Sequence, residues 1–207
     1  MKILSSALAL SLLAANCATA QGGTPPGQVA RDFEVALTGG GPPPRWEVVA
    51  DPTVVDGKAL AQLSPDPTDL RFPLAIYRAA APTDLEVSTR FKAISGKVDQ
   101  AGGLAVRLKD PNNYYVTRAN ALEDNVRFYR VVRGRRHELA GANVKVAGRE
   151  WHTLTLRAEG DRFTISFDGK QLFSHVDKTF TEAGKVALWT KADSVTHFET
   201  LVVKPLR

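Results

Sequence analysis

Hydrophobic and polar residues alternate with a period of two through most of the second half of the chain. The pattern is clear in residues 84–93 and repeats in 151–158 and 162–168. Its apolar-face members are Leu85, Val87, Thr89 and Phe91, then Leu154 and Leu156, then Phe163, Ile165 and Phe167. Such alternation is typical of strands with one buried face, so we expect these side chains to form a core.

Similar runs, separated by turn residues, extend over most of the chain. We predict strands near residues 32–37, 46–50, 59–63, 71–78, 84–93, 102–109, 114–121, 125–132, 136–140, 151–158, 162–168, 171–176, 185–191 and 195–204. Asp168-Gly169 is a strong hairpin signal, because a type I′ turn needs positive φ. Only residues 179–185 suggest a helical turn, with Thr179 or Thr181 as its cap. Many strands without a long helix predict an all-β jelly-roll sandwich of two antiparallel sheets.

The first twenty residues follow a different pattern. An apolar run over residues 3–15 follows a lysine, and Ala18-Thr19-Ala20 places small residues before Gln21. These features are typical of a bacterial secretory signal, so we expect a periplasmic or extracellular protein. The alternative is a lipoprotein signal anchored at Cys17, which the polar Asn16 before it disfavours.

The stretch after this segment is rich in proline, because ten of the twelve prolines lie between Pro25 and Pro82. We expect a signal peptide over residues 1–20, a flexible segment over 21–30 and one β-sandwich domain over 31–207. The hydrophobic fraction of 43% and charged fraction of 24% are ordinary for a globular domain. No apolar run in the body approaches the roughly 20 residues of a membrane span, so we expect no transmembrane segment.

Charge and motif content exclude several functions. A net charge of +5 is only mildly basic and predicts no nucleic-acid binding. The densest basic cluster is Arg133, Arg135 and Arg136, which we interpret as a solvated hairpin tip, with contact to an acidic polymer as the alternative. No serine-nucleophile or zinc motif is present. We interpret His152 and His175 as structural or surface residues.

Two acidic features have a plain structural interpretation. Asp84 and Glu86 share a strand face, as the carboxylates of glycosidases do, but that face continues with solvated polar residues. Asp110, Asn112 and Asn113 offer the oxygen ligands that calcium takes, but the same sequence is a common turn, which we favour. We therefore predict no cofactor, with a calcium ion at this loop as the alternative.

Residues 99–125 carry the densest set of candidate binding groups. The alternation places Arg107 opposite the aliphatic residues, beside Gly103 and Ala105, which predicts an open floor with one cation. In the next strand Tyr114, Arg118 and Asn120 share one face.

Val186 and Leu188 predict a core face, which directs Trp189 and Lys191 outward. An exposed indole stacks on the apolar face of a sugar while polar groups bind its hydroxyls. The alternative is that Trp189 is a core residue. The candidate ligand-binding residues are Asp99, Gln100, Arg107, Tyr114, Arg118, Asn120, Asp124, Trp189 and Lys191.

Three motifs resemble the 3-keto-disaccharide hydrolase family, formerly a domain of unknown function, and more loosely laminin-G-like modules. Residues 101–107 match its N-S-G-I-x-x-R strand, 151–169 match its W-(N/H)-x-(Y/L) strand and following hairpin, and 184–188 match its closing strand. The resemblance covers about residues 30–204. It implies a concanavalin A-like sandwich that handles carbohydrate outside the cytoplasm. It also implies that Arg107, on the concave sheet, is the best-matched functional position of the family in this chain.

These observations favour a secreted or periplasmic carbohydrate-binding module that uses the concave sheet face. One alternative is a hydrolase or lyase acting on 3-keto-glycosides or related sugars. Such an enzyme needs an acid or base, such as Asp99, Glu123 or Asp124, within reach of Arg107. Another is an interaction module without a sugar ligand. The catalytic residues, the sugar and the oligomeric state stay open at this level.

Overall fold

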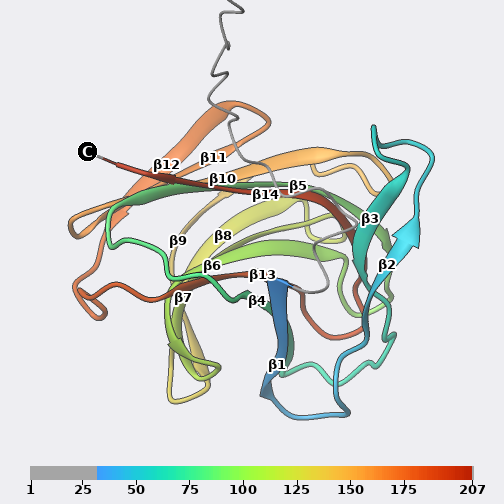
Figure 1. Cartoon of the computed structure of the whole chain (residues 1–207), viewed down its shortest axis with the longest axis horizontal. Helices are drawn as coiled ribbons and strands as arrows, with labels where there is room; N and C mark the ends of the chain where they lie inside the picture. Colours follow the sequence, from blue (N-terminus) through green and yellow to red (C-terminus); the bar gives the residue numbers. More distant parts are fainter. Residues whose placement is uncertain (1–31, 207) are drawn as a thin grey trace, which may run out of the picture.

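The alternating stretches form strands that pair into two sheets (Figure 1). The computed structural model describes residues 32–206, so the expected signal peptide, Cys17 and the segment 21–30 lie outside the described residues. Fourteen strands form two antiparallel seven-stranded sheets, A and B. Among residues 32–206, no helix has the length and apolar character that crossing a membrane requires.

Sheet A has the order β1–β4–β13–β6–β7–β8–β9. Its strands are β1 (Phe33–Gly39), β4 (Arg71–Tyr77), β13 (Lys185–Trp189), β6 (Ala101–Asp110), β7 (Asn113–Asn120), β8 (Asn125–Val132) and β9 (Arg135–Asn143). Sheet B has the order β12–β11–β10–β5–β14–β3–β2. Its strands are β12 (Lys170–Val176), β11 (Arg162–Phe167), β10 (His152–Glu159), β5 (Leu85–Ser95), β14 (Val195–Pro205), β3 (Lys58–Gln62) and β2 (Trp46–Ala50). The predicted jelly-roll sandwich is confirmed.

The core lies between the sheets and consists of the inward faces that the alternation predicts. All nine predicted apolar-face residues are buried. Tyr115 of β7 and Phe128 of β8 pack on Phe163 of β11, with ring centroids 4.4 and 5.1 Å from that of Phe163. The hairpin prediction is also confirmed, because Asp168 and Gly169 both have positive φ, 48° and 77°.

The predicted helical turn over residues 179–185 is wrong. Its backbone groups bind elsewhere, because the N–H of Phe180 donates to Tyr115 Oη at 3.0 Å and its carbonyl accepts from Arg107 Nη1 at 2.9 Å. The Phe180 side chain is buried in the core between the sheets. The Phe180 carbonyl is thus bound to Arg107, whereas a helical turn would bond it to an N–H four residues further on.

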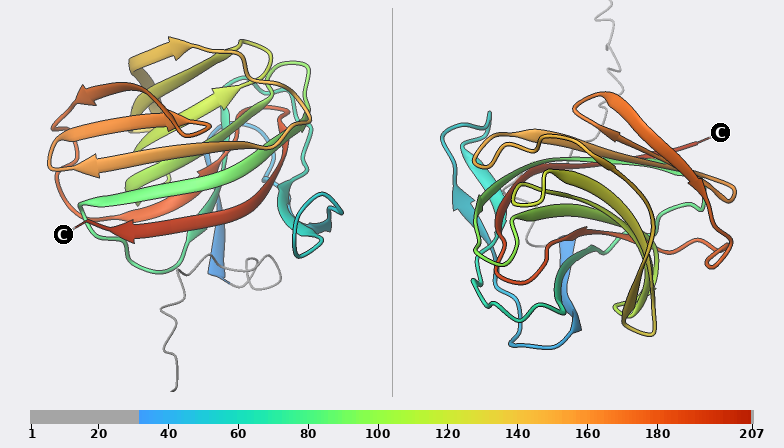
Figure 2. Two further views of the ribbon diagram at one scale, coloured as in Figure 1. Left: turned by 90° about the horizontal axis from the view of Figure 1, so that it is seen from above. Right: turned by 180° about the vertical axis from the view of Figure 1, so that it is seen from behind.

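Sheet A is strongly curved, and its outer face is concave (Figure 2). This face carries a second apolar cluster, formed mainly by β4, β6, β7, β8 and β13. Its members include Phe72, Leu74, Ile76, Ala105, Tyr114, Val116, Tyr129, Val131, Ala187 and Trp189. Neither sheet packs over this cluster, so its side chains bury one another within the curve of the sheet. The outer face of sheet B, in contrast, carries half-exposed polar side chains along β5 and β10.

Candidate functional site

Three residues lie side by side on the concave face, one on each of three neighbouring strands. Trp189 on β13 pairs with Gly103 on β6, which pairs with Arg118 on β7. A Cβ added at Gly103 would lie 3.1 Å from Arg118 Cβ and 3.2 Å from Trp189 Cε3. The small residue is therefore required, and the space predicted above it is filled by the protein's own indole.

Four aromatic residues form what we call the aromatic floor: Phe72, Tyr114, Tyr129 and Trp189. Trp189 stacks on Phe72 with ring centroids 5.4 Å apart, and its Nε1 donates to Tyr114 Oη at 3.2 Å. Burial raises the pKa of Tyr114 to about 12. The predicted outward register of Trp189 is confirmed, but the expectation of an exposed indole is wrong, because the side chain is fully buried.

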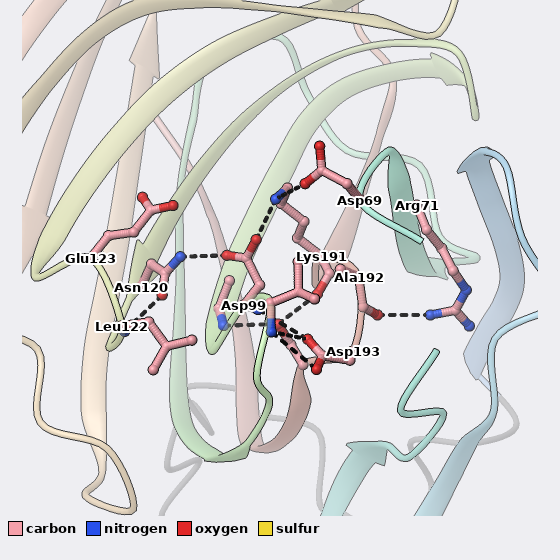
Figure 3. A network of polar contacts seen from close by, with 12 residues as sticks. Asp69, Arg71, Asp99, Asn120, Leu122, Glu123, Lys191, Ala192 and Asp193 are labelled. Atoms are coloured by element: carbon pink, nitrogen blue, oxygen red, sulfur yellow. Dashed lines mark hydrogen bonds and ion pairs between the residues drawn. The ribbon is translucent and has the colours of Figure 1, made fainter. Parts of the chain in front are cut away.

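A row of polar side chains adjoins this floor, and Figure 3 shows part of the row. The Lys191 ammonium binds Asp99, and it also binds Asp69 at 2.5 Å. Asp99 in turn accepts a hydrogen bond from Asn120 Nδ2. Burial alone would lower the pKa of Lys191, but its bonds to the two carboxylates raise it. Lys191 therefore keeps its charge although it is almost completely buried.

The row continues on β7 and into the loop that follows. Arg118 donates to Asn125 Oδ1, to Glu123 Oε2 at 2.7 Å and to Tyr129 Oη at 3.2 Å. Burial would raise the pKa of Glu123, but the charge of Arg118 holds it below its ordinary value. Arg118 Nε is buried and has no hydrogen-bond partner in the described residues.

We call this set the polar row. It consists of Asp69, Lys191, Asp99, Asn120, Arg118, Glu123 and Asn125. Its interior members are nearly inaccessible, whereas the side chains of Glu123 and Asp69 are 46% and 67% exposed. The row thus presents two carboxylates to solvent and fixes them through buried cations.

The loops that carry Asp99 and Lys191 are fixed by buried bonds. The Asp193 carboxylate accepts from the N–H groups of Lys97 at 2.6 Å and Asp99 at 3.0 Å. Arg71 Nη1 donates to the carbonyl of Ala192 at 2.9 Å (Figure 3). These contacts hold the backbone that carries Asp99 and Lys191, and so fix where the two side chains lie.

Gln100 directly follows Asp99, but its side chain is not part of the polar row. Its Nε2 donates to the carbonyl of Gly96 at 3.1 Å. Gln100 also lines a cleft of about 760 Å³ whose other walls include Pro65, Pro67 and Arg149.

Arg136 is a site residue that the sequence interpretation missed. Its guanidinium carbon lies 4.4 Å from the ring centroid of Tyr129, 5.0 Å from that of Phe72 and 5.9 Å from that of Trp189. The interpretation of the basic cluster as a solvated tip therefore fails for Arg136, whereas Arg135 is exposed. A sequence signal exists: a two-residue turn at Arg133-Gly134 puts Arg136 opposite Val131, which pairs with Tyr114.

Arg107 does not lie on the concave face, and the expectation that it does is wrong. A β-bulge between Val106 and Asp110, with φ of +48° at Arg107, turns its side chain inward. Its guanidinium carbon lies 5.1 Å from the Phe163 ring centroid, and its nitrogens donate to the carbonyls of Phe180, Thr83 and Gly160. Arg107 thus binds main-chain groups at the edge of the sandwich.

Asp124 also stays outside the polar row. Its carboxylate accepts from Lys145 Nζ at 2.9 Å and from the N–H of Val146 at 3.1 Å, which fixes the turn after β7. His152 has a structural environment as interpreted, with Nδ1 2.8 Å from Asp168 Oδ2 and Nε2 3.0 Å from the carbonyl of Ala147.

The remaining acidic candidates, Asp84 and Asp110, accept hydrogen bonds that stabilise turns. Asp84 Oδ1 accepts from the N–H of Gly160 at 2.9 Å. Asp110 Oδ1 accepts from the N–H of Asn112 at 2.7 Å and from Asn113 Nδ2 at 3.0 Å, which forms the predicted turn. Within residues 32–206, no group of three or more His, Cys, Asp or Glu side chains is arranged to hold a metal ion.

Curved sandwiches of this kind occur among lectins and carbohydrate-binding modules. The model of the family described as the galactocerebrosidase C-terminal lectin domain matches residues 85–206, and the chain belongs to this family. The matched family is not the 3-keto-disaccharide hydrolase family, so the finer part of that resemblance is not confirmed. A search of curated protein sequences finds no match.

Solved structures share the fold at low sequence identity. The carbohydrate-binding module CBM66 from Bacillus subtilis is 21% identical, with a TM-score of 0.63 over 77% of this chain and 92% of that one. A Bacillus subtilis protein of unknown function with a galectin-like fold is 11% identical, with a TM-score of 0.60 over 84% and 90%. The exoplasmic/lumenal domain of VIP36, bound to Ca²⁺ and Man3GlcNAc, is 12% identical, with a TM-score of 0.60 over 86% and 85%.

Proposed function

We propose that the protein is an extracytoplasmic carbohydrate-binding module whose ligand occupies the concave face of sheet A. The observation that carries this proposal is the polar row, in which buried cations hold two half-exposed carboxylates beside an aromatic floor. Carboxylates fixed in this way accept hydrogen bonds from sugar hydroxyls with little loss of side-chain entropy.

Family membership supports the same proposal, since the matched family is named for a lectin domain. The CBM66 structure is that of a carbohydrate-binding module, and one VIP36 structure holds a mannose-containing sugar. The leader-like segment before Gln21 favours an extracytoplasmic location.

Glu123 and Asp69 are the groups we assign to hydroxyl recognition. Arg118 orients Glu123, and Lys191 orients Asp69, through the contacts described above. The buried Asp99 has one oxygen on Lys191 and the other on Asn120, so it positions Lys191 rather than contacting the ligand.

Calorimetric titration of a panel of neutral and acidic oligosaccharides tests the proposal. We expect at least one member to bind, and we expect Glu123→Gln and Asp69→Asn each to weaken binding about tenfold or more. Glu159→Gln is the matched control, because Glu159 is an exposed, arginine-paired carboxylate on sheet B. Failure of every sugar to bind, or equal affinity in the two site variants and the control, would overturn the proposal.

Hydrolysis is the second candidate function, and Glu123 is the exposed carboxylate that favours it. Its lowered pKa suits a base more than a proton donor at neutral pH. The same preparations, incubated with a 3-keto-disaccharide, should release monosaccharide if the protein is an enzyme. Release that Glu123→Gln abolishes would support this candidate, and an absence of release would reject it.

A further inference from the structure

Arg136 is a cation on the concave face that has no acidic partner among residues 32–206. No hydrogen bond or ion pair to its guanidinium is formed by residues 32–206. Its Nη1 is buried and has no hydrogen-bond partner in the described part of the chain. A guanidinium has five N–H donors in a fixed plane, so it can bind an anionic group in addition to its contacts within residues 32–206.

Three other cations of this face each contact a carboxylate. Lys191 binds Asp69 and Asp99, and Arg118 binds Glu123. On β8, Arg127 Nε lies 3.4 Å from a carboxylate oxygen of Glu138 on β9. Arg136 differs from these three cations, because no carboxylate in the described part of the chain contacts it directly.

The position of Arg136 is fixed by the fold. The tight turn at Arg133-Gly134, where both residues have positive φ, brings β9 back along β8 and places Arg136 opposite Val131. Its guanidinium then lies over Tyr129 and Phe72 of the aromatic floor. Contact with aromatic faces stabilises a cation and orients its plane, but it does not satisfy the N–H donors at the edge of that plane.

The nearby acids do not take this role. The direct bond to Lys191 lowers the pKa of Asp69 most. The charge of Arg136 lowers it further, but Arg136 has no direct bond to this carboxylate. Glu138 is directed to Arg127. A carboxylate supplied by a ligand would form the two parallel N–H···O bonds that a guanidinium favours.

We infer that the sugar bound at the concave face carries a carboxylate, as a hexuronate does, and that this carboxylate pairs with Arg136. The inference rests on the proposed carbohydrate-binding function and names its ligand class. The hydroxyls of the same sugar then remain for Glu123 and Asp69. A neutral sugar would leave the Arg136 donors without an anionic partner.

Titration with a hexuronate oligosaccharide and with its carboxyl-reduced neutral counterpart tests this inference. We expect the parent protein to bind the acidic form at least about tenfold more tightly. Arg136→Gln should remove that preference, and Arg136→Lys should reduce it, because an ammonium keeps the charge but lacks the planar fork. Arg135→Gln is the matched control, since Arg135 is the exposed arginine next along β9, and it should keep the preference.

The outcomes separate this inference from the proposed function. Equal affinity for the acidic and reduced forms, with binding still sensitive to Glu123→Gln, would overturn the acidic-sugar inference and leave the module proposal standing. Loss of preference in Arg135→Gln equal to that in Arg136→Gln would also overturn it, because bulk charge would then be the cause. Absence of binding to every sugar would overturn both. Melting temperatures and the Arg136→Lys variant identify any loss that comes from misfolding.

Discussion

Trp189 and Phe72 stack on the outer face of sheet A, with ring centroids 5.4 Å apart and ring planes 19° apart. The two residues lie on neighbouring strands, β13 and β4, and both are essentially inaccessible to solvent. Trp189 and Phe72 therefore belong to a second core, although they point away from the first one. The concave sheet packs its outward aromatic side chains against one another.

Truncation of Trp189 should therefore destabilise the fold. We expect Trp189→Ala to lower the free energy of unfolding by about 3–5 kcal/mol, since a large buried side chain leaves a cavity. Urea denaturation measures this loss. Trp189→Phe is the control and should lose clearly less, because a ring still stacks on Phe72. An alanine variant as stable as the parent would show that the indole is exposed in solution.

Arg107 should affect stability and leave sugar binding unchanged. Arg107→Lys removes donors from the buried carbonyl of Phe180 and from the carbonyl of Gly160, and an unsatisfied buried carbonyl costs about 1–3 kcal/mol. We expect a lower midpoint of denaturation with affinity for the oligosaccharide unaltered. A loss of affinity in a variant that is still folded at the assay temperature would place Arg107 in the binding site and contradict the structure.

The strands are predictable from the sequence because one buried face imposes alternation of period two. Leu154, Leu156 and Ile165 show this pattern directly, and Asp168-Gly169 shows the turn between two strands. The apolar residues of the concave face follow the same alternation on the opposite side, so the outward register of Trp189 is predictable as well. Its burial is not, because curvature of the sheet depends on all seven strands together.

The candidate site was less predictable, for identifiable reasons. The bulge that turns Arg107 inward has no sequence signature beyond a change in alternation, and it exchanges the faces of Arg107 and Leu108. Asp69 lies in a proline-rich loop without strand register, so only the fold brings it to Lys191. Arg136, in contrast, follows from counting residues outward from the Arg133-Gly134 turn.

Asp193 should make the site sensitive to acid. Burial alone would raise the pKa of Asp193, but bonds from the N–H groups of Lys97, Asp99 and Val98 lower it. A carboxyl whose pKa is lower in the folded state stabilises the fold above its unfolded pKa, about 3.9, and that contribution is lost as pH falls through the folded value. Asp193→Asn should be less stable than the parent at neutral pH, and the difference should shrink below about pH 4. Denaturant titrations at several pH values measure this, and parallel curves for the two proteins would contradict it.

Alkali should destabilise the fold through two adjacent tyrosines that point to opposite faces of β7. Burial raises the pKa of Tyr114 to about 12, and burial together with Asp177 raises that of Tyr115 to about 12. A phenol whose folded pKa exceeds its unfolded value of about 10 contributes stability below that value, and the contribution is lost as pH rises toward 12. We expect the free energy of unfolding to fall steeply above pH 10, and phenolate absorbance of these two residues to appear only with unfolding. Tyr114→Phe and Tyr115→Phe should each make the fall less steep. Full phenolate absorbance in a protein that is still folded at pH 11 would show that neither ring is buried as the structure places it.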